Sequence, residues 1–317
     1  MDLAGTNWMR PLGSTGLTVS AVTIGGSPLG SMPHLYGHEV SRQDAGELVS
    51  AVLDSPFRTL DTSNNYTDGE SERRIGAAIS ARGGLPEDFL VITKVDARDG
   101  DYSGERVRES VRESKRNLGL EVLPMVHLHD PEYFDFDEIT APGGAVDALV
   151  ALRDSDEVGH IGLAGGNVHE MSRYLALGVF EAVLTHNRWT LVDRSATDLI
   201  AQAQSLNVAV VNAAVYGGGI LANPHGATHY GYGVAPQPVL DAVAMMSAVC
   251  AEWSTDLATA ALQFSLRDSR FATTVVGISK RSRLDALAVA AAAELPEEFW
   301  QQLETVVPTR DHWLDFR

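Results

Sequence analysis

Short runs of apolar, β-branched residues alternate along the chain with longer stretches in which apolar residues recur at helical spacing. The short runs predict eight strands. Because these runs are apolar throughout, both faces of each strand are expected to be buried, as in a parallel sheet covered by helices. The predicted strands lie at residues 21–25, 57–61, 90–95, 123–129, 159–165, 180–185, 208–213 and 273–277.

Two of the intervening stretches carry apolar residues at positions i, i+3, i+4 and i+7, which is the pattern of an amphipathic helix. Each stretch starts near a serine that is followed three residues later by an aspartate, the spacing of a helix-capping pair. These pairs are Ser41 with Asp44 and Ser195 with Asp198. The apolar positions are Ala45, Leu48, Val49 and Val52 in the first stretch, and Ala196, Leu199, Ile200 and Ala203 in the second.

The alternation of strands and helices predicts the fold. Eight strand–helix units favour a closed (β/α)8 barrel, an α/β fold of the TIM-barrel type, preceded by a short hairpin within residues 9–20. An open, doubly wound sheet shows the same alternation and is the alternative. No linker or change in composition divides the chain, so residues 1–317 are expected to form a single domain.

The connection at residues 216–238 is longer, and richer in glycine and proline, than a plain link between two elements requires. Connections of this kind often act as lids over an active site, so a lid is predicted here. The alternative is a mobile surface loop with no role in the site.

The charge of the chain narrows the classes of partner. With 24 Lys and Arg against 42 Asp and Glu, the formal net charge is −18, which argues against binding to nucleic acid or to an anionic membrane. Cys250 is the one cysteine, which excludes an internal disulfide and a multi-cysteine zinc site. No apolar run reaches membrane-spanning length, and the first residues lack an export signal. We therefore expect a cytoplasmic protein with a small-molecule partner.

Polar residues able to take part in catalysis follow the predicted strands. Asp61 ends the second strand and Tyr66 follows it, Lys94 lies in the third, and His129 ends the fourth. In a barrel the active site forms at the C-terminal ends of the strands, so these four side chains are expected to meet. Each alone has an ordinary explanation, such as a turn residue or a solvated strand end, but together they favour a catalytic site.

The same residues stand in motifs that resemble the aldo-keto reductases. The likeness covers most of the chain and implies a (β/α)8 barrel, an NAD or NADP cofactor, and Asp61, Tyr66, Lys94 and His129 as the catalytic residues. The motifs are MRPLGSTGL at 9–17, DTSNNY at 61–66 followed by Gly69, Ser71, Glu72 and Gly76, ITK at 92–94, LGL at 118–120, HDPE at 129–132 and GISK at 277–280.

The interconversion of a carbonyl and an alcohol calls for these residue types. The reaction needs a hydride carrier, which no protein side chain supplies, and a group that gives or takes a proton at the reacting oxygen. A tyrosine, with a pKa of about 10 in solution, becomes suited to this task when a lysine stabilises its phenolate form. Tyr66 and Lys94 would fill these roles. Asp61 would hold Lys94 in place, and His129 would hold the reacting oxygen.

The resemblance also implies where the cofactor binds. The nicotinamide carboxamide is expected at Asn167 and His186, where the family usually has Ser or Asn and then Gln. The string GGGILA at 217–222 matches a dinucleotide fingerprint only formally, because Pro224 follows where a helix is required. Instead, a glycine-rich loop would approach the pyrophosphate, and a basic helix start would flank the adenosine end. The loop includes Ala214, Gly217 and Gly219, and the basic segment includes Ser279, Lys280 and Arg283.

Two further segments bear on the substrate. RWTLV at 188–192 and VNAA at 211–214 resemble the bacterial branch of the family that oxidises free aldoses at the anomeric carbon. The predicted reaction is therefore the oxidation of an aldose at C1 to a lactone, with pyridoxal oxidation or general aldehyde and ketone reduction as alternatives. Ser27, Trp189 and His127 are the residues predicted to line the substrate pocket.

Two other classes of protein are kept as alternatives. HLHD at 127–130, together with His186, could activate water at a metal, as in a barrel hydrolase that uses His127 and His129. The H-x-H pair of such hydrolases follows the first strand, whereas here it ends the fourth, so no metal ligand is assigned. The second class is non-catalytic: some barrels of the family resemble regulatory subunits that hold a cofactor but do not turn over a substrate.

Overall fold

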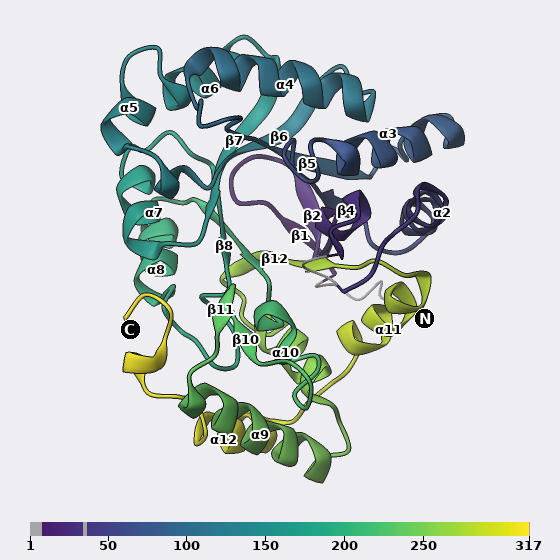
Figure 1. Cartoon of the computed structure of the whole chain (residues 1–317), viewed down its shortest axis with the longest axis vertical. Helices are drawn as coiled ribbons and strands as arrows, with labels where there is room; N and C mark the ends of the chain where they lie inside the picture. The colour runs from purple at the N-terminus through teal and green to yellow at the C-terminus, as the bar shows by residue number, and fades with distance from the viewer. Residues whose placement is uncertain (1–7, 34–36, 317) are drawn as a thin grey trace.

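Eight parallel strands close into a barrel in the computed structural model, which describes residues 8–33 and 37–316. Around the barrel the hydrogen-bonded order is β12, β3, β4, β5, β6, β7, β8 and β9 (Figure 1). The predicted barrel is confirmed, and the open doubly wound sheet is wrong. The strands span Val22–Gly25 (β3), Thr59–Asp61 (β4), Leu90–Val95 (β5), Leu123–His129 (β6), Val158–Gly165 (β7), Ala182–His186 (β8), Ala209–Ala213 (β9) and Phe271–Gly277 (β12).

Each barrel strand is followed by a helix that packs outside it (Figure 1). In chain order these helices are α2, α3, α4, α6, α7, α8, α10 and α11, while α5, α9 and α12 are additional. The helices span Arg42–Leu53 (α2), Glu70–Arg82 (α3), Gly104–Leu118 (α4), Phe136–Thr140 (α5), Ala145–Asp154 (α6), Val168–Leu175 (α7), Thr197–Ser205 (α8), Gln237–Glu252 (α9), Leu257–Leu266 (α10), Arg281–Ala291 (α11) and Glu297–Glu304 (α12). No helix among the described residues has both the length and the hydropathy needed to cross a bilayer.

The strands are buried on both faces, as their apolar sequences predict. Alternate residues of β5 and β6 show this: Val91 and Val126 face the helices, whereas Ile92 and Met125 pack inside the barrel. The two faces belong to separate apolar clusters. Polar residues at the ends of the inward-facing rows therefore emerge together at the C-terminal end of the barrel, which we call the mouth.

The predicted hairpin closes the opposite end of the barrel. It consists of β1 (Met9–Pro11) and β2 (Thr18–Ser20), which pair antiparallel. Leu12 and Val19 are fully buried among the inward-facing side chains. Gly13 approaches Ala209, the first residue of β9, so closely that a side chain at position 13 would touch it. The mouth is thus the end of the barrel that is left for a ligand.

The long connection at 216–238 contains the short hairpin of β10 (His229–Tyr230) and β11 (Gly233–Val234). Tyr230 anchors it, because its buried hydroxyl donates to the carbonyl of Asn187 at 2.5 Å and lies 2.8 Å from Thr190 Oγ1. The connection is therefore packed against the barrel and is not a loose surface loop. Closure as a lid stays a prediction.

One of the two predicted helix caps is correct. The side chain of Ser41 accepts a hydrogen bond from the backbone N–H of Asp44 and caps α2. The cap at Ser195 is wrong, since α8 begins one residue later than expected, after Ala196, and has no side-chain cap. The backbone N–H of Ser195 donates to Asp193 instead, in a turn that precedes the helix.

The close approach of α3 and α4 yields a prediction. A Cβ on Gly76 would clash with the backbone oxygen of Asn117, so we expect Gly76→Ala to force the helices apart and lower the free energy of unfolding by about 1–3 kcal/mol. Gly46, in α2, has no atom within 4 Å of the corresponding position. Gly46→Ala should therefore leave stability unchanged or raise it by about 0.5–1 kcal/mol. Urea unfolding of both variants measures the difference, and equal effects would contradict it.

Candidate active site

A buried ammonium group lies at the centre of the mouth. Lys94 ends an inward-facing row of β5 and is 1% exposed. Its Nζ donates to Asp61 Oδ1 at 2.6 Å and to the carbonyl of Thr62 at 2.6 Å, both at the end of β4. The same Nζ lies 3.3 Å from the hydroxyl of Tyr66. Three of the four residues predicted to be catalytic therefore meet in one hydrogen-bonded group.

The fourth residue, His129, stands beside this group at the end of β6. Its ring lies edge-on to the ring of Tyr66, with 5.9 Å between the ring centres. Nδ1 of His129 lies 2.6 Å from Oδ1 of Asp96, whose carboxylate is almost fully buried. The imidazole is thus held from behind by a carboxylate, and Nε2 is directed away from that carboxylate.

Two residues that support His129 were not found from the sequence. Asp96 also accepts hydrogen bonds from Ser63 Oγ and from the backbone N–H of Asn65 at 3.0 Å, so it ties the β4 loop to β6. Tyr102 accepts a hydrogen bond from the N–H of His129 at 2.9 Å and donates from its hydroxyl to the carbonyl of Val95 at 2.8 Å. The signal for Asp96 was its place directly after the third predicted strand.

The pKa values of the two histidines of β6 are shifted in opposite directions. Burial lowers the pKa of His129, but the carboxylates of Asp96 and Asp130 raise it by more, so the pKa lies above its ordinary value. Burial lowers the pKa of His127 to about 3, with Lys94 adding to the shift. His127 is therefore neutral at physiological pH.

His127 lies inside the barrel wall, and its predicted place in the substrate pocket is wrong. Its side chain is 1% exposed, and neither ring nitrogen has a hydrogen-bond partner among the described residues. The ring lies over Gly162 of β7, where a Cβ would come within 2.5 Å of it. Glycine at this position makes room for the imidazole.

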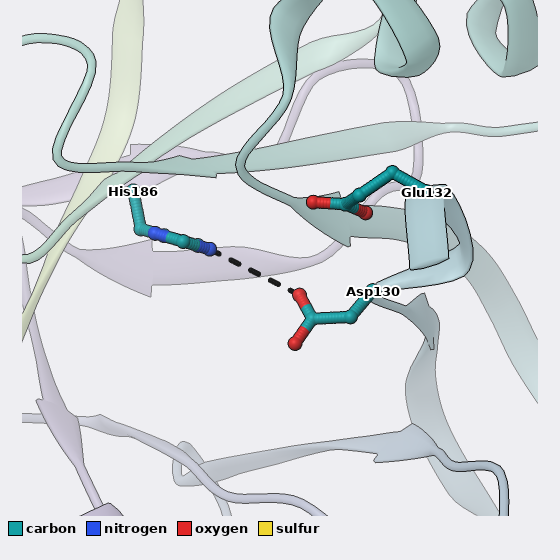
Figure 2. Close-up of side chains that lie close together, drawn as sticks. All are labelled: Asp130, Glu132 and His186. Carbon is teal, nitrogen blue, oxygen red and sulfur yellow. Dashed lines mark ion pairs between the residues drawn. The ribbon is translucent and has the colours of Figure 1, made fainter. Parts of the chain in front are cut away.

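Figure 2 shows a second group of side chains at the mouth, consisting of Asp130, Glu132 and His186. Asp130 lies between two histidines: Oδ2 is 3.8 Å from Nε2 of His129, and Oδ1 is 3.9 Å from Nε2 of His186. Burial raises the pKa of Asp130, but the two histidines lower it by more, to about 2. The carboxylate is therefore ionised at physiological pH.

Glu132 organises the loop after β7. Its Oε1 accepts hydrogen bonds from the backbone N–H groups of Gly166, at 2.5 Å, and Asn167, at 3.2 Å. The side-chain oxygen of Asn167 in turn caps α7 and is exposed. Asn167 thus has a structural role at the start of a helix, and its contact with the nicotinamide carboxamide stays a prediction.

Asp130, Glu132 and His186 offer ligand atoms within 4.8 Å of one another, and this is the one such group in the described part of the chain. His127 and His129 do not belong to it. The metal site that the hydrolase alternative placed on His127 and His129 is therefore wrong. Because one oxygen of Glu132 is already held by two backbone N–H groups, the arrangement also has a sufficient explanation without a cation.

Trp189 is a core residue, so its predicted place on the pocket wall is wrong as well. Its indole packs on Phe264 of α10 and on Phe271 of β12, outside the barrel, and is 8% exposed. Asn212, part of the VNAA segment, faces the same way and donates to the carbonyl of Trp189 at 2.9 Å and to Ser265 Oγ at 2.8 Å. These residues attach α10 to β9. Ser27 follows β3 at the mouth and is half-buried, and its contact with substrate stays a prediction.

The glycine-rich loop after β9 has the open backbone that was expected for a phosphate. Ala214, Gly217 and Gly219 all have left-handed backbone angles, with φ of 55°, 59° and 102°. No atom lies within 4 Å of the position that a Cβ on Gly219 would occupy, whereas one on Gly217 would clash with the ring of Tyr230. The backbone at Gly219 is therefore open to its surroundings, whereas Gly217 is buried against Tyr230.

The basic segment lies near this loop. Lys280 precedes α11 and provides no side-chain cap, so the N–H groups of the first turn face outward with a local positive charge. Burial raises the pKa of Tyr216 to about 12, and the charge of Arg283 acts against this shift. The basic segment follows β12, which pairs with β9, so it leaves the barrel beside the glycine-rich loop. Ser279 Oγ lies 2.9 Å from Nε2 of His38. The segment after β12 and the segment after β3 thus meet at the mouth, although they lie far apart in the sequence.

Comparison with known proteins identifies the family. Residues 21–308 match the model of the aldo/keto reductase family. The chain belongs to this family. Among similar proteins are D-threo-aldose 1-dehydrogenase from a Pseudomonas species, 27% identical over 93% of this chain and 97% of that one, and pyridoxal 4-dehydrogenase of Microbacterium luteolum, 28% identical over 93% and 96%. L-galactose dehydrogenase of Arabidopsis thaliana is 30% identical over 90% and 88%.

Solved structures agree on the fold. An aldo-keto reductase of Bacillus halodurans in its holo form has a TM-score of 0.78 at 21% identity, covering 98% of this chain and 99% of that one. Glycerol dehydrogenase of Gluconobacter oxydans has a TM-score of 0.73 at 16% identity, covering 95% of each chain. As an aldo/keto reductase with dehydrogenases among its relatives, the protein is an NAD(P)-dependent oxidoreductase of small molecules, which decides against the non-catalytic class.

The pair of Asp96 and His129 makes the stability of this aldo/keto reductase depend on pH. The folded pKa of His129 is raised, so the pair stabilises the fold fully below the unfolded pKa of about 6.5, and this stabilisation is lost as pH rises through the folded pKa. We expect Asp96→Asn to lower the free energy of unfolding by about 1–3 kcal/mol at pH 5.5, and by less at pH 9.

Urea unfolding across this pH range measures the effect. Asp198→Asn, at an exposed position of α8, is the matched control for loss of a carboxylate and should show little change. An Asp96→Asn effect that is equal at both pH values would contradict a charged pair.

Proposed function

We propose that this protein oxidises a free aldose at C1 to the lactone, with NAD or NADP as the hydride acceptor. The observation that carries the proposal is the position of the Tyr66 hydroxyl, 3.3 Å from a buried ammonium and beside His129 at the mouth of the barrel. The names of two relatives, D-threo-aldose 1-dehydrogenase and L-galactose dehydrogenase, support sugars as the substrate class.

Tyr66 is the proposed proton acceptor. An ammonium beside a phenol stabilises the phenolate, which is the form that takes a proton from a hydroxyl group. Asp61, at 2.6 Å from Lys94, keeps that ammonium charged and fixes its direction despite its burial. In oxidation, the anomeric hydroxyl passes its proton to Tyr66. In the reverse direction Tyr66 returns the proton to the carbonyl oxygen.

His129 is proposed to position the reacting oxygen. Its Nδ1 is occupied by Asp96, so Nε2 is the nitrogen left to contact a substrate. The raised pKa of the imidazole favours a protonated ring, in which Nε2–H donates a hydrogen bond to the oxygen. The half-buried Tyr66 and His129 thus converge on one position at the mouth.

The residues present fit a nicotinamide dinucleotide. The open backbone of Gly219 suits close contact with a pyrophosphate, and the uncapped start of α11 suits a second anionic group. Lys280 and Arg283 would hold the adenosine end, and since neither discriminates against a 2′-phosphate, both NAD and NADP are proposed to bind. When bound, the nicotinamide accepts or donates the hydride. His186 remains the side chain proposed to lie near its carboxamide.

Pyridoxal is the second candidate substrate. The likeness to pyridoxal 4-dehydrogenase covers as much of this chain as the likeness to the aldose enzyme, at 28% identity. General reduction of aldehydes and ketones would need the same proton-transfer group, so simple aldehydes belong in the same substrate panel.

Tyr66→Phe tests the proton transfer. Because only the hydroxyl is removed, we expect kcat/KM to fall about 100- to 10,000-fold while the affinity for reduced cofactor is unchanged. Cofactor binding can be measured by fluorescence titration. Tyr133→Phe removes a hydroxyl from a side chain that is 74% exposed, and it should retain activity. If a folded Tyr66→Phe variant keeps more than a tenth of wild-type activity, the assigned role is wrong.

A substrate panel tests the reaction itself. We expect reduced cofactor to form with at least one pentose, hexose or 6-deoxyhexose, and not with the corresponding 1-O-methyl glycoside, in which the reacting hydroxyl is blocked. Absorbance of the reduced cofactor measures the rate, with pyridoxal and simple aldehydes in the same panel. Turnover of methyl glycosides would rule out reaction at C1, and reduction of aldehydes alone would indicate a general carbonyl reductase. EDTA should leave every rate unchanged.

A further inference from the structure

Asp130 is a charged residue at the mouth that the proposed proton transfer does not use. Neighbouring residues of a strand point to opposite faces, so Asp130 would be expected to face away from His129. Its left-handed backbone, with φ of 47°, instead turns the side chain back toward the mouth. Figure 2 shows its carboxylate directed at His186. The other oxygen of the carboxylate, Oδ2, lies 3.8 Å from Nε2 of His129.

The carboxylate of Asp130 has room for a further ligand. Its distances to the two histidine nitrogens, 3.8 and 3.9 Å, are longer than hydrogen bonds, and Oδ1, which is buried on the side of His186, has no hydrogen-bond partner among the described residues. The side chain is 36% exposed, whereas those of Asp61 and Asp96 are 5% and 7% exposed. Asp130 is therefore the carboxylate of this group that a substrate can reach.

The spacing of Asp130 and His129 matches a pair of neighbouring hydroxyl groups. If the reacting oxygen contacts Nε2 of His129, the hydroxyl on the adjacent carbon lies one hydrogen-bond length further along. The 3.8 Å between Nε2 and Oδ2 of Asp130 leaves such a hydroxyl within reach of the carboxylate. A hydroxyl that donates to an ionised carboxylate forms a charge-assisted hydrogen bond, which is stronger than a neutral one.

We propose that Asp130 recognises the hydroxyl on the carbon next to the reacting carbon, which is C2 of an aldose. This assignment rests on the proposed oxidation of free aldoses and narrows it to sugars with a C2 hydroxyl. A site built to bind a hydroxyl rejects an analogue that lacks it, because the carboxylate is then left desolvated and unpaired. His129 and His186 lie 3.8 and 3.9 Å from the two oxygens of the carboxylate, one on each oxygen.

Asp130→Asn is the variant that separates recognition from folding. Asparagine has the same shape and tolerates the left-handed backbone as well as aspartate does, so the loop is expected to keep its course. It removes the charge and places an amide group beside the substrate. Asp137→Asn, at an exposed position in α5, is the matched control for loss of a carboxylate. A thermal melt of each variant checks that it is folded.

The experiment compares kcat/KM for D-galactose and D-ribose with the values for 2-deoxy-D-galactose and 2-deoxy-D-ribose. The variants are then assayed with whichever pair has the parent sugar of higher wild-type kcat/KM. We expect the wild-type enzyme to prefer the parent sugar roughly 10- to 100-fold, the range of one charge-assisted hydrogen bond. In Asp130→Asn this preference should shrink to a few-fold, through loss of activity on the parent sugar alone. The affinity for NAD should be unchanged in the same variant.

The outcomes distinguish the two levels of the proposal. Equal wild-type activity on parent and 2-deoxy sugars would overturn the role of Asp130 while leaving aldose oxidation in place. An equal loss on both sugars in Asp130→Asn would also overturn it, because it would indicate a general effect on the site. Activity that EDTA abolishes and Zn²⁺ restores would assign Asp130, Glu132 and His186 to a cation instead. No turnover of any aldose would overturn the proposed function, and this assignment with it.

Discussion

The buried ammonium of Lys94 is the constraint on which the mouth of this barrel depends. Moving an ammonium out of water is unfavourable unless anionic and polar groups surround it closely. Asp61 and the carbonyl of Thr62 meet this need at 2.6 Å each, and both belong to the end of the neighbouring strand. The parallel pairing of β4 with β5 sets this geometry. The loop that leaves β4 then carries Tyr66 back to the same ammonium.

The surroundings of the polar side chains near Lys94 differ with their depth in the barrel. Side chains of the same type therefore differ in pKa and in exposure. His127 lies deepest and is neutral, because burial and the nearby ammonium both disfavour its charged form. His129, two residues further along β6, has a raised pKa because Asp96 and Asp130 face it. Asp96 is enclosed, whereas Asp130 reaches the surface. Asp96 therefore suits a supporting role, and Asp130 suits a contact with a ligand.

Family membership and the geometry of the mouth bear on different properties of the protein. Membership of the aldo/keto reductase family establishes the class of reaction, and the sugar and pyridoxal dehydrogenases among the relatives narrow the substrates to be tried. In the VNAA segment, the amide of Asn212 holds α10 against β9 through the carbonyl of Trp189 and Ser265 Oγ. The better candidates for residues that select the substrate are Asp130 and the hairpin that brings Tyr232 to His186.

The sequence by itself determined the barrel and the meeting of Asp61, Tyr66, Lys94 and His129. Apolar strands repeat along the chain, and parallel strands bring their C-terminal ends to one edge, so residues at those ends must converge. The tertiary structure alone decided which polar residues had other tasks. Trp189 and Asn167 follow strands too, yet one packs under α10 and the other caps α7. Asp96 and Asp130 acquired their roles from a buried hydrogen bond and a left-handed backbone angle, which depend on packing between strands and leave no periodic signal in the sequence.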